Sequence, residues 1–267
     1  MKILFFGDIC GKIGRKAFKK VLPGFVKKYQ PDFIFANGEN LAHGVGVTAR
    51  VADDILSLGV DFLTSGNHFF AKKDDVDVMI EEKTKVIRPE NYPGGFAGKG
   101  YVLLEKNGQQ ILLINLLGRV FIENGKNILN DPFNKAKEIL INYPQVKVKI
   151  VDFHAEATSE KQALGYFLDG QISALVGTHT HIPTADARIL PKGTAYITDL
   201  GMVGARDSVI GISIESSIDY MTGKEKKLKA DIPEVGPTIA QGVFLDIDET
   251  SGLAKQIERI EAQAEIS

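Results

Sequence analysis

His179 and His181 lie one residue apart at the end of an apolar run, in the segment Gly177-Thr178-His179-Thr180-His181. Imidazole nitrogens bind metal ions, and in an extended backbone residues i and i+2 point to the same side. The two histidines could therefore address one metal ion or two neighbouring ions. On its own, this segment fits an exposed polar loop that closes at Pro183 equally well. The positions of the other candidate ligands must therefore distinguish a metal site from such a loop.

Those other candidates follow apolar runs that predict buried strands of the parallel type. The runs are Ile3–Phe6 before Asp8, Phe33–Ala36 before Glu39, Val60–Leu63 before Asn67, Val146–Phe153 before His154, and Ile172–Val176 before the histidine pair. Binding sites of open α/β sheets form at the carboxyl ends of the strands, so we expect these side chains to gather at one edge. Four of the five histidines occupy such positions, namely His68, His154, His179 and His181.

The ligand types narrow the choice of metal and of reaction. Carboxylate, carboxamide and imidazole groups without a thiolate suit Mn(II), Fe or Zn(II). Because there are more ligands than one ion needs, we expect two ions bridged by a carboxylate. Two ions roughly 3.5–4 Å apart are the usual arrangement for in-line attack on phosphorus. Phosphoester hydrolysis is therefore the leading reaction class.

The ordered motifs resemble those of the calcineurin-like metallophosphoesterase superfamily: Gly7-Asp8, Gly38-Glu39-Asn40, Gly66-Asn67-His68, His154 and Gly177–His181. Further stretches are similar to the bacterial YmdB-like branch, namely Asn37–Asn40, Arg88-Pro89, Asp152–Lys161 and Leu190–Tyr196. This resemblance extends over most of the chain. It implies an α/β fold, specifically a four-layer α/β/β/α sandwich, and hydrolysis of phosphodiesters, with 2′,3′-cyclic nucleotides as the associated substrate.

The resemblance also implies a role for each matching residue. One metal ion would be held by Asp8, Glu39, Asn40 and His181, and the second by Glu39 as the bridge, Asn67, His154 and His179. His68 would stay off the metals and act as the general acid, or hold the phosphoryl group, while a hydroxide between the ions attacks phosphorus.

Two departures from the superfamily pattern concern Cys10 and Phe69-Phe70. Cys10 occupies a position where a histidine is common, and Asn40 would replace that imidazole. A neutral carboxamide ligand favours Fe or Mn, with Zn as a third option. Phe69 and Phe70 follow His68 where a polar residue is usual, so the partner that orients His68 is not identified.

Weaker candidates lie outside these motifs. His43 and Asn91 are candidates for substrate binding, although a structural role in a loop is the favoured interpretation of His43. Arg119 is a candidate for binding phosphate or a base, and Glu156 either orients a ligating histidine or is a solvated carboxylate. Cys10 is interpreted as a small buried hydrophobe rather than a reactive thiol.

Composition bounds the class of protein. The chain has 267 residues, of which 44% are hydrophobic and 25% charged, and we expect one domain over residues 1–267. The 32 basic and 34 acidic residues balance, which argues against binding of duplex nucleic acid. A single cysteine favours the reducing cytoplasm, and no apolar run is long enough for a membrane span. An oligomer of identical chains remains open.

Local patterns predict most of the remaining elements. Predicted helices cover Arg15–Tyr29, with a kink or break at Pro23-Gly24, Thr48 (as N-cap) to Leu58, the region around Val76–Ile80, Asp131 (as N-cap) to Ile141, and Ser159–Leu168. Predicted hairpins pair Tyr101–Glu105 with Gln110–Leu116 and Gly242–Ile247 with Lys255–Ile260, and a short strand covers Tyr196–Thr198. Arg88–Gly100 is predicted to be a long surface loop, and Met202–Ala230 has no clear pattern.

Two other functions fit the same residues. A regulatory protein could keep the site to bind a nucleotide or an RNA end, with catalysis incidental. A phosphomonoesterase or nuclease on the same scaffold would differ only in the shape of the pocket.

Overall fold

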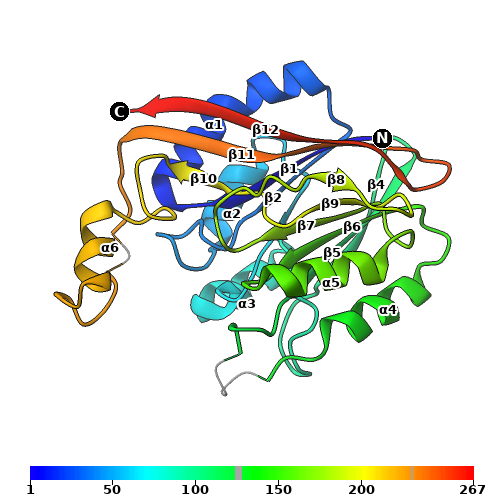
Figure 1. The fold of residues 1–267 in the computed structure, drawn as a ribbon, viewed down its shortest axis with the longest axis horizontal. Coiled ribbons are helices and arrows are strands. Elements are labelled where there is room, and N and C mark those ends of the chain that lie inside the picture. The colour runs from blue at the N-terminus through cyan, green and yellow to red at the C-terminus, as the bar shows by residue number, and fades with distance from the viewer. Residues whose placement is uncertain (124–127, 230) are drawn as a thin grey trace.

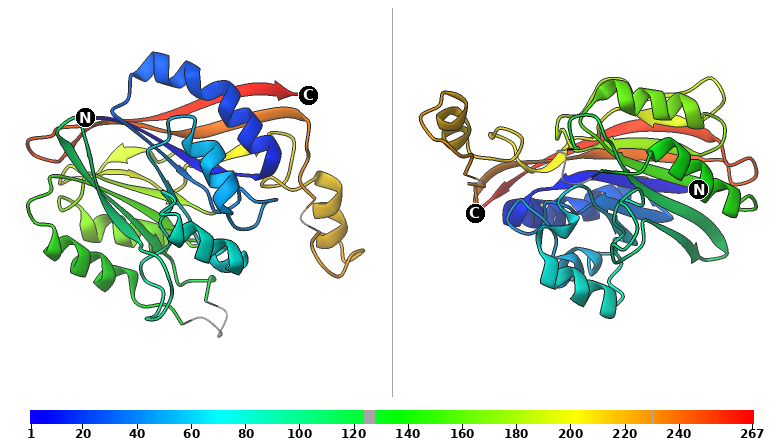
Figure 2. Two further views of the ribbon diagram at one scale, coloured as in Figure 1. Left: turned by 180° about the vertical axis from the view of Figure 1, so that it is seen from behind. Right: turned by 90° about the horizontal axis from the view of Figure 1, so that it is seen from below.

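Two six-stranded sheets lie face to face, and helices cover the outer face of each (Figures 1 and 2). The structure is a computed structural model that describes residues 1–123, 128–229 and 231–267. The strand order is β12-β11-β10-β1-β2-β3 in the first sheet and β4-β5-β6-β7-β9-β8 in the second. The expected four-layer α/β/β/α sandwich is therefore confirmed.

The first sheet contains β1 (Lys2–Ile9), β2 (Phe33–Asn37), β3 (Phe62–Thr64), β10 (Met202–Ala205), β11 (Gly236–Ile247) and β12 (Ala254–Ile266). The second contains β4 (Tyr101–Lys106), β5 (Gln109–Leu117), β6 (Val148–His154), β7 (Ala174–Thr178), β8 (Arg188–Ile189) and β9 (Ala195–Ile197). The first sheet packs against α1 (Gly11–Tyr29), α2 (Ala49–Leu56) and α3 (Lys73–Glu81), and the second against α4 (Pro132–Asn142) and α5 (Thr158–Leu168). A 3-10 turn, η1 (Phe69–Ala71), precedes α3, and α6 (Ile214–Met221) projects from the body of the sandwich (Figure 1).

The continuous apolar run of β1 fills two cores because alternate side chains point to opposite faces of a strand. Ile3 and Phe5 lie in the core between the two sheets, whereas Leu4 and Phe6 pack under the helices. A strand that is buried on both faces needs apolar residues at every position, and this explains why the sequence shows no polar alternation here.

The carboxyl ends of the central strands meet at one end of the sandwich. β1, β2 and β3 are parallel neighbours in the first sheet, and β5, β6, β7 and β9 are parallel neighbours in the second. The polar residues that follow these strands therefore face one another across two sheets. This corrects the expectation that they gather along the edge of one sheet.

Asp8 owes its orientation to a register shift in β1. Simple alternation would place Asp8 on the helix-covered face with Leu4 and Phe6, but the pairing with β2 shifts between Phe6 and Asp8. An irregularity of this kind re-aims the following side chain. Gly7 permits it, because a Cβ at Gly7 would overlap the carbonyl oxygen of Gly201.

Most predicted elements are confirmed within a few residues, including the helix capped by Thr48, whose hydroxyl accepts from the Val51 amide, and both hairpins. Of the predicted kink or break at Pro23-Gly24, the break is wrong, because α1 continues through Pro23 as one helix. Pro23 is exposed, so water can hydrate the carbonyl that loses its hydrogen bond. In the unassigned region the structure contains β10 and α6, while Ala230 lies outside the described residues. None of the helices in the described ranges is long and apolar enough to cross a membrane.

Replacing Gly7 by alanine is expected to lower the free energy of unfolding by about 3 kcal/mol, because the new methyl group overlaps the Gly201 backbone. Gly24→Ala is the matched control: it lies in an exposed part of α1 with free space around it, and helix propensity predicts a gain of about 0.5–1 kcal/mol. Urea denaturation of both variants measures the difference. Equal stabilities would contradict the proposed close approach at Gly7.

Candidate metal centre

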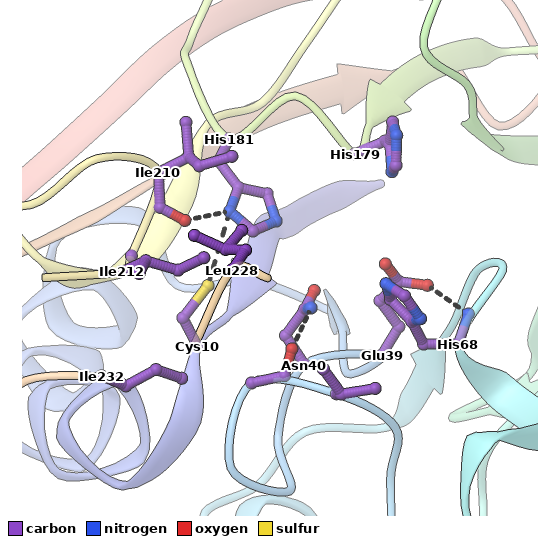
Figure 3. A pocket seen from close by; sticks show the side chains of 13 residues that line it. Cys10, Glu39, Asn40, His68, His179, His181, Ile210, Ile212, Leu228 and Ile232 are labelled. Carbon is purple, nitrogen blue, oxygen red and sulfur yellow. Dashed lines mark hydrogen bonds between the residues drawn. The ribbon is translucent and has the colours of Figure 1, made fainter. Parts of the chain in front are cut away.

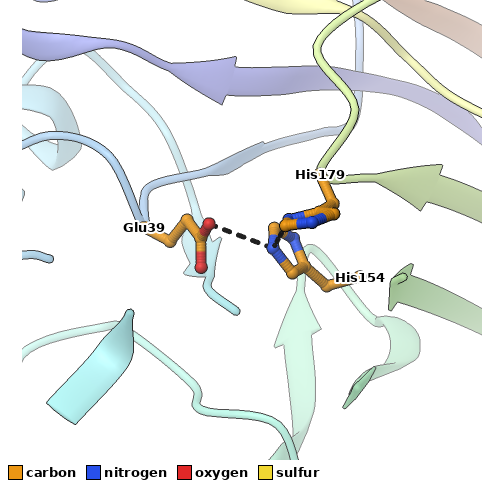
Figure 4. A group of neighbouring side chains, drawn as sticks. All are labelled: Glu39, His154 and His179. Carbon is orange, nitrogen blue, oxygen red and sulfur yellow. Dashed lines mark hydrogen bonds and ion pairs between the residues drawn. The ribbon is translucent and has the colours of Figure 1, made fainter. Parts of the chain in front are cut away.

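Glu39, His154 and His179 form a compact group between the two sheets (Figure 4). His154 is the last residue of β6, Glu39 lies two residues after β2, and His179 follows β7 directly. His154 Nε2 lies 3.0 Å from Glu39 Oε1, 3.0 Å from His179 Nδ1 and 3.2 Å from Asn67 Oδ1. Four side chains predicted as ligands of one ion are thus brought together.

The outer hydrogen bonds of the two imidazoles indicate which nitrogens carry lone pairs. His154 Nδ1 lies 2.9 Å from Thr178 Oγ1, whose hydroxyl hydrogen is donated to Asp152 Oδ1, so His154 Nδ1 is the donor to Thr178. His179 Nε2 lies 3.0 Å from Glu156 Oε2 and donates to it. In the neutral tautomers that result, the inner nitrogens His154 Nε2 and His179 Nδ1 are acceptors. A metal ion shared with the Glu39 and Asn67 oxygens would satisfy both lone pairs.

A second group of candidate ligands, Asp8, Asn40 and His181, lies beside the first. Asn40 and His181 line a cavity together with Glu39 and His179 (Figure 3). Asp8 Oδ1 is 3.7 Å from His181 Nε2, while His181 Nδ1 donates to the Ile210 carbonyl at 2.7 Å. Asn40 uses its amide nitrogen to donate to the Gly44 carbonyl at 2.7 Å, so its oxygen is left free. Asp8 Oδ1 and Asn40 Oδ1 are the buried side-chain atoms of the described residues that have no hydrogen-bond partner. Unpaired buried oxygens are costly, and a cation would satisfy both.

Burial and the neighbouring charges shift the pKa values of the candidate ligands in different directions. Burial lowers the pKa of His154 and of His181, but the acidic groups beside them raise both pKa values above the ordinary value. Burial, followed by the charge of His154, lowers the pKa of His179 to about 3, so its lone pair is available at neutral pH. Burial raises the pKa of Asp8, but His181 and His154 lower that pKa by more, and the net result is a carboxylate with a pKa well below its ordinary value.

A buried polar network beneath the ligands joins the two sheets. Asp152 Oδ2 accepts from Thr64 at 2.5 Å and from Asn37 Nδ2 at 3.0 Å, both on the first sheet. Its other oxygen accepts from Thr178, which in turn accepts from His154. Burial raises the pKa of Asp152 to about 6. The network fixes the orientation of His154 from behind.

His179 and His181 do not lie in extended backbone, so the prediction that they point to the same side of a strand is wrong. β7 ends at Thr178, and both histidines have positive φ, 101° for His179 and 64° for His181. The turn directs His179 toward His154 and His181 toward Asp8. Such conformations cost about 1–3 kcal/mol each for residues other than glycine, so neighbouring contacts must hold them.

Those contacts centre on Thr180, which lies between the two histidines. Asp199 Oδ2 accepts from the Thr180 amide at 3.1 Å and from its hydroxyl at 2.8 Å. The same oxygen pairs with Lys161 Nζ at 2.8 Å, and both charged side chains are fully buried. Thr180 is therefore an anchored residue, and the Asp199–Lys161 pair holds the histidine turn from below.

Neither Lys161 nor Asp199 was predicted as a site residue, although the sequence pattern around each of them is unusual. Lys161 lies on the buried stripe of α5 with Leu164 and Leu168, where a lysine is out of place. Asp199 follows the short apolar strand β9, just as the candidate ligands follow theirs. Its oxygens, however, are used by protein donors, namely Lys161, Thr180 and the Gly201 amide.

His68 and Cys10 line the cavity without belonging to either group (Figure 3). The His68 amide donates to Glu39 Oε2 at 3.2 Å, and no described residue forms a hydrogen bond with its ring. The partner that orients this ring is thus not found among the described residues. Cys10 is buried with Sγ 3.7 Å from His181 Nδ1, so it is both a small buried residue and a neighbour of a candidate ligand.

The weaker candidates lie elsewhere, except Glu156. His43 is exposed on a loop and does not line the cavity. Asn91 is fully buried, and its amide group bonds to the Leu117 and Asn130 backbones, which is a structural role. Arg119 forms an exposed ion pair with Glu123. Glu156 contacts His179, in agreement with an orienting role.

The fold and the site define a class of protein. The sandwich, with its polar groups at the strand ends, is the metallophosphoesterase fold. It aligns with a 5′-nucleotidase precursor from Thermus thermophilus at a TM-score of 0.58 and 13% identity, covering 98% of this chain and 54% of that one. At this identity the likeness concerns the fold alone.

Within that class, the chain belongs to the YmdB-like protein family, whose sequence model matches residues 4–260. A 2′,3′-cyclic-nucleotide 2′-phosphodiesterase of Bacillus subtilis (strain 168) is 44% identical over 266 residues, which is 97% of this chain and 96% of the relative. The crystal structure of a novel phosphatase from Mycoplasma pneumoniae superposes with a TM-score of 0.91 at 36% identity, covering 100% of this chain and 94% of that one.

Lys161→Met is expected to lower the free energy of unfolding by about 3–5 kcal/mol, because it leaves the Asp199 carboxylate buried without its counter-charge. The exposed Lys27→Met variant is the control and should stay within about 0.5 kcal/mol of the wild type. Chemical denaturation followed by circular dichroism measures both. A small effect at Lys161 would show that the pair does not hold this part of the fold.

Proposed function

We propose that this chain is a binuclear metal-dependent phosphodiesterase that hydrolyses small phosphodiesters, with 2′,3′-cyclic nucleotides as its substrates. The observation that carries the proposal is the convergence of acceptor atoms from five strand ends, two of which, Asp8 Oδ1 and Asn40 Oδ1, are buried without a donor. Buried acceptors without a donor are costly, and bound cations would offset that cost. The B. subtilis relative is named a 2′,3′-cyclic-nucleotide 2′-phosphodiesterase, which supports the choice of substrate.

In this proposal each ion has its own set of ligands, with Glu39 shared between them. One set is Asp8, Glu39, Asn40 and His181, and the other is Glu39, Asn67, His154 and His179. When bound, two ions polarise the phosphoryl group and lower the pKa of water toward neutrality. The carboxamide ligands and the absence of a thiolate among them favour Fe or Mn over Zn.

His68 is proposed as the general acid. Its ring lines the cavity, and its amide is tied to Glu39, so it lies next to the proposed bridging ligand without being a ligand itself. A protonated imidazole there would give its proton to the leaving ribose oxygen as the bond from that oxygen to phosphorus breaks. The single cysteine favours the cytoplasm as the compartment.

Purified protein is expected to carry about two transition-metal ions per chain and to hydrolyse 2′,3′-cyclic AMP and a generic aryl phosphodiester. Removal of the ions with a chelator should abolish turnover, and addition of Fe(II) or Mn(II) should restore it. Elemental analysis combined with the two assays measures this. Protein without bound metal and without metal-stimulated turnover would refute the proposal, and turnover restricted to phosphomonoesters would assign the scaffold to a phosphatase.

His68→Ala is expected to reduce kcat for 2′,3′-cyclic AMP by about 10²–10⁴-fold while both metal ions are retained, because general acid catalysis is lost. His43→Ala is the control, since His43 is exposed outside the cavity, and its kcat should be unchanged. Kinetics and elemental analysis of both variants decide the matter. Unchanged turnover in His68→Ala would remove His68 from the mechanism.

A further inference from the structure

The cavity beside the candidate ligands has one polar side and one aliphatic side (Figure 3). Its volume is about 340 Å³. Glu39, His68 and His179 form the polar side. Across the cavity from them lie Ile210, Ile212, Leu228 and Ile232, which we name the aliphatic wall (Figure 3). None of these four side chains can form a hydrogen bond or bind a metal, so the proposed chemistry does not explain why they line the cavity.

The aliphatic wall is held in place by the same residues that shape the metal side. The Ile210 carbonyl accepts from His181 Nδ1 at 2.7 Å, so the backbone of the wall contacts a candidate ligand directly. Ile232 packs closely over Gly44, where a Cβ would overlap its side chain. The Gly44 carbonyl in turn accepts from the Asn40 amide. The wall is therefore a built part of the site.

Parts of the wall are exposed to solvent in the absence of a ligand. Ile210 is 44% exposed and Leu228 is 43% exposed, and both line the cavity. Covering aliphatic surface is favourable in proportion to the area removed from water. A ligand that combines a phosphate group with a flat, weakly polar body would reach the polar side and cover the wall at the same time.

We propose that the aliphatic wall binds the nucleobase of the substrate and does so without discriminating between the four bases. This inference rests on the proposed phosphodiesterase function and extends it to substrate selection. Contacts between aliphatic side chains and the face of a base contribute through buried area, which every base offers. Base identity is read by hydrogen bonds to the base edges, and the side chains of the wall have no donors or acceptors.

The test compares substrates with and without a base on metal-loaded, full-length protein. 2′,3′-Cyclic AMP, CMP, GMP and UMP should have kcat/KM values within about fivefold of one another. Glycerol 1,2-cyclic phosphate has the same five-membered phosphodiester ring and no base, and its KM should be at least about tenfold higher. Similar KM values for the baseless and the nucleotide substrates would overturn the proposal, as would a preference of about a hundredfold for one base.

Ile212→Ser removes aliphatic surface from the wall and leaves every candidate ligand unchanged in sequence. It should raise the KM for 2′,3′-cyclic AMP by about tenfold, with kcat and the KM for glycerol 1,2-cyclic phosphate nearly unchanged, because uniform binding energy is lost. Ile212→Leu should keep the wild-type KM. Ile218→Ser, at an exposed position of α6 outside the cavity, is the matched control and should have no effect. An unchanged KM of Ile212→Ser for 2′,3′-cyclic AMP would overturn the proposal.

A binding measurement separates this inference from the proposed function. Calorimetry with adenosine 3′-monophosphate and glycerol 2-phosphate reports on the wall even if neither cyclic substrate is hydrolysed. The nucleotide should bind the wild type at least about tenfold more tightly than glycerol 2-phosphate, and Ile212→Ser should remove most of this difference. Equal affinities in the wild type would refute base binding, whereas a clear difference without turnover would refute only the phosphodiesterase activity.

Discussion

Burial of acceptor groups between two sheets is the constraint on which this structure depends. A carboxylate, a carboxamide oxygen or an imidazole lone pair loses its water there and needs a donor or a cation in exchange. Buried acceptors at these strand ends fall into two groups. Asp152 and Asp199 are satisfied by hydroxyl, amide and lysine donors of the chain itself. Asp8 and Asn40 each keep an oxygen free, which distinguishes these two candidate ligands from Asp152 and Asp199.

The rule that polar residues after buried parallel strands share a site explains most of what the sequence predicted. It works because β1, β2 and β3, and likewise β6 and β7, are parallel, so their carboxyl ends point the same way. The rule cannot state how many sheets there are, and it placed the residues on one edge rather than across two. The same rule also applies to Asp199 after β9, but the apolar run of β9 is only three residues long and predicts a strand less clearly.

Local sequence patterns did not predict the structure where the backbone departs from a regular helix or strand. The spacing of His179 and His181 predicted an extended strand. The chain instead turns after Thr178, and this turn is held by Asp199, which pairs with Lys161 of α5. These residues lie far apart in the sequence. The region from Met202 to Lys229 could not be assigned because its short elements, β10 and α6, lack a long periodic stretch. Tertiary contacts define both regions, and no single window of sequence contains them.

The hydrogen bond between His181 and the Ile210 carbonyl joins two parts of the site that chemistry would treat as separate. A candidate metal ligand and the backbone of the aliphatic wall share it, so a shift of the segment around Ile210 would change the direction of the His181 lone pair. If that segment settles differently with and without a nucleotide, occupancy at one position alters affinity at the other. Thermodynamic reciprocity then requires the effect to be equal in both directions, and nucleotide and metal would be linked ligands of one protein.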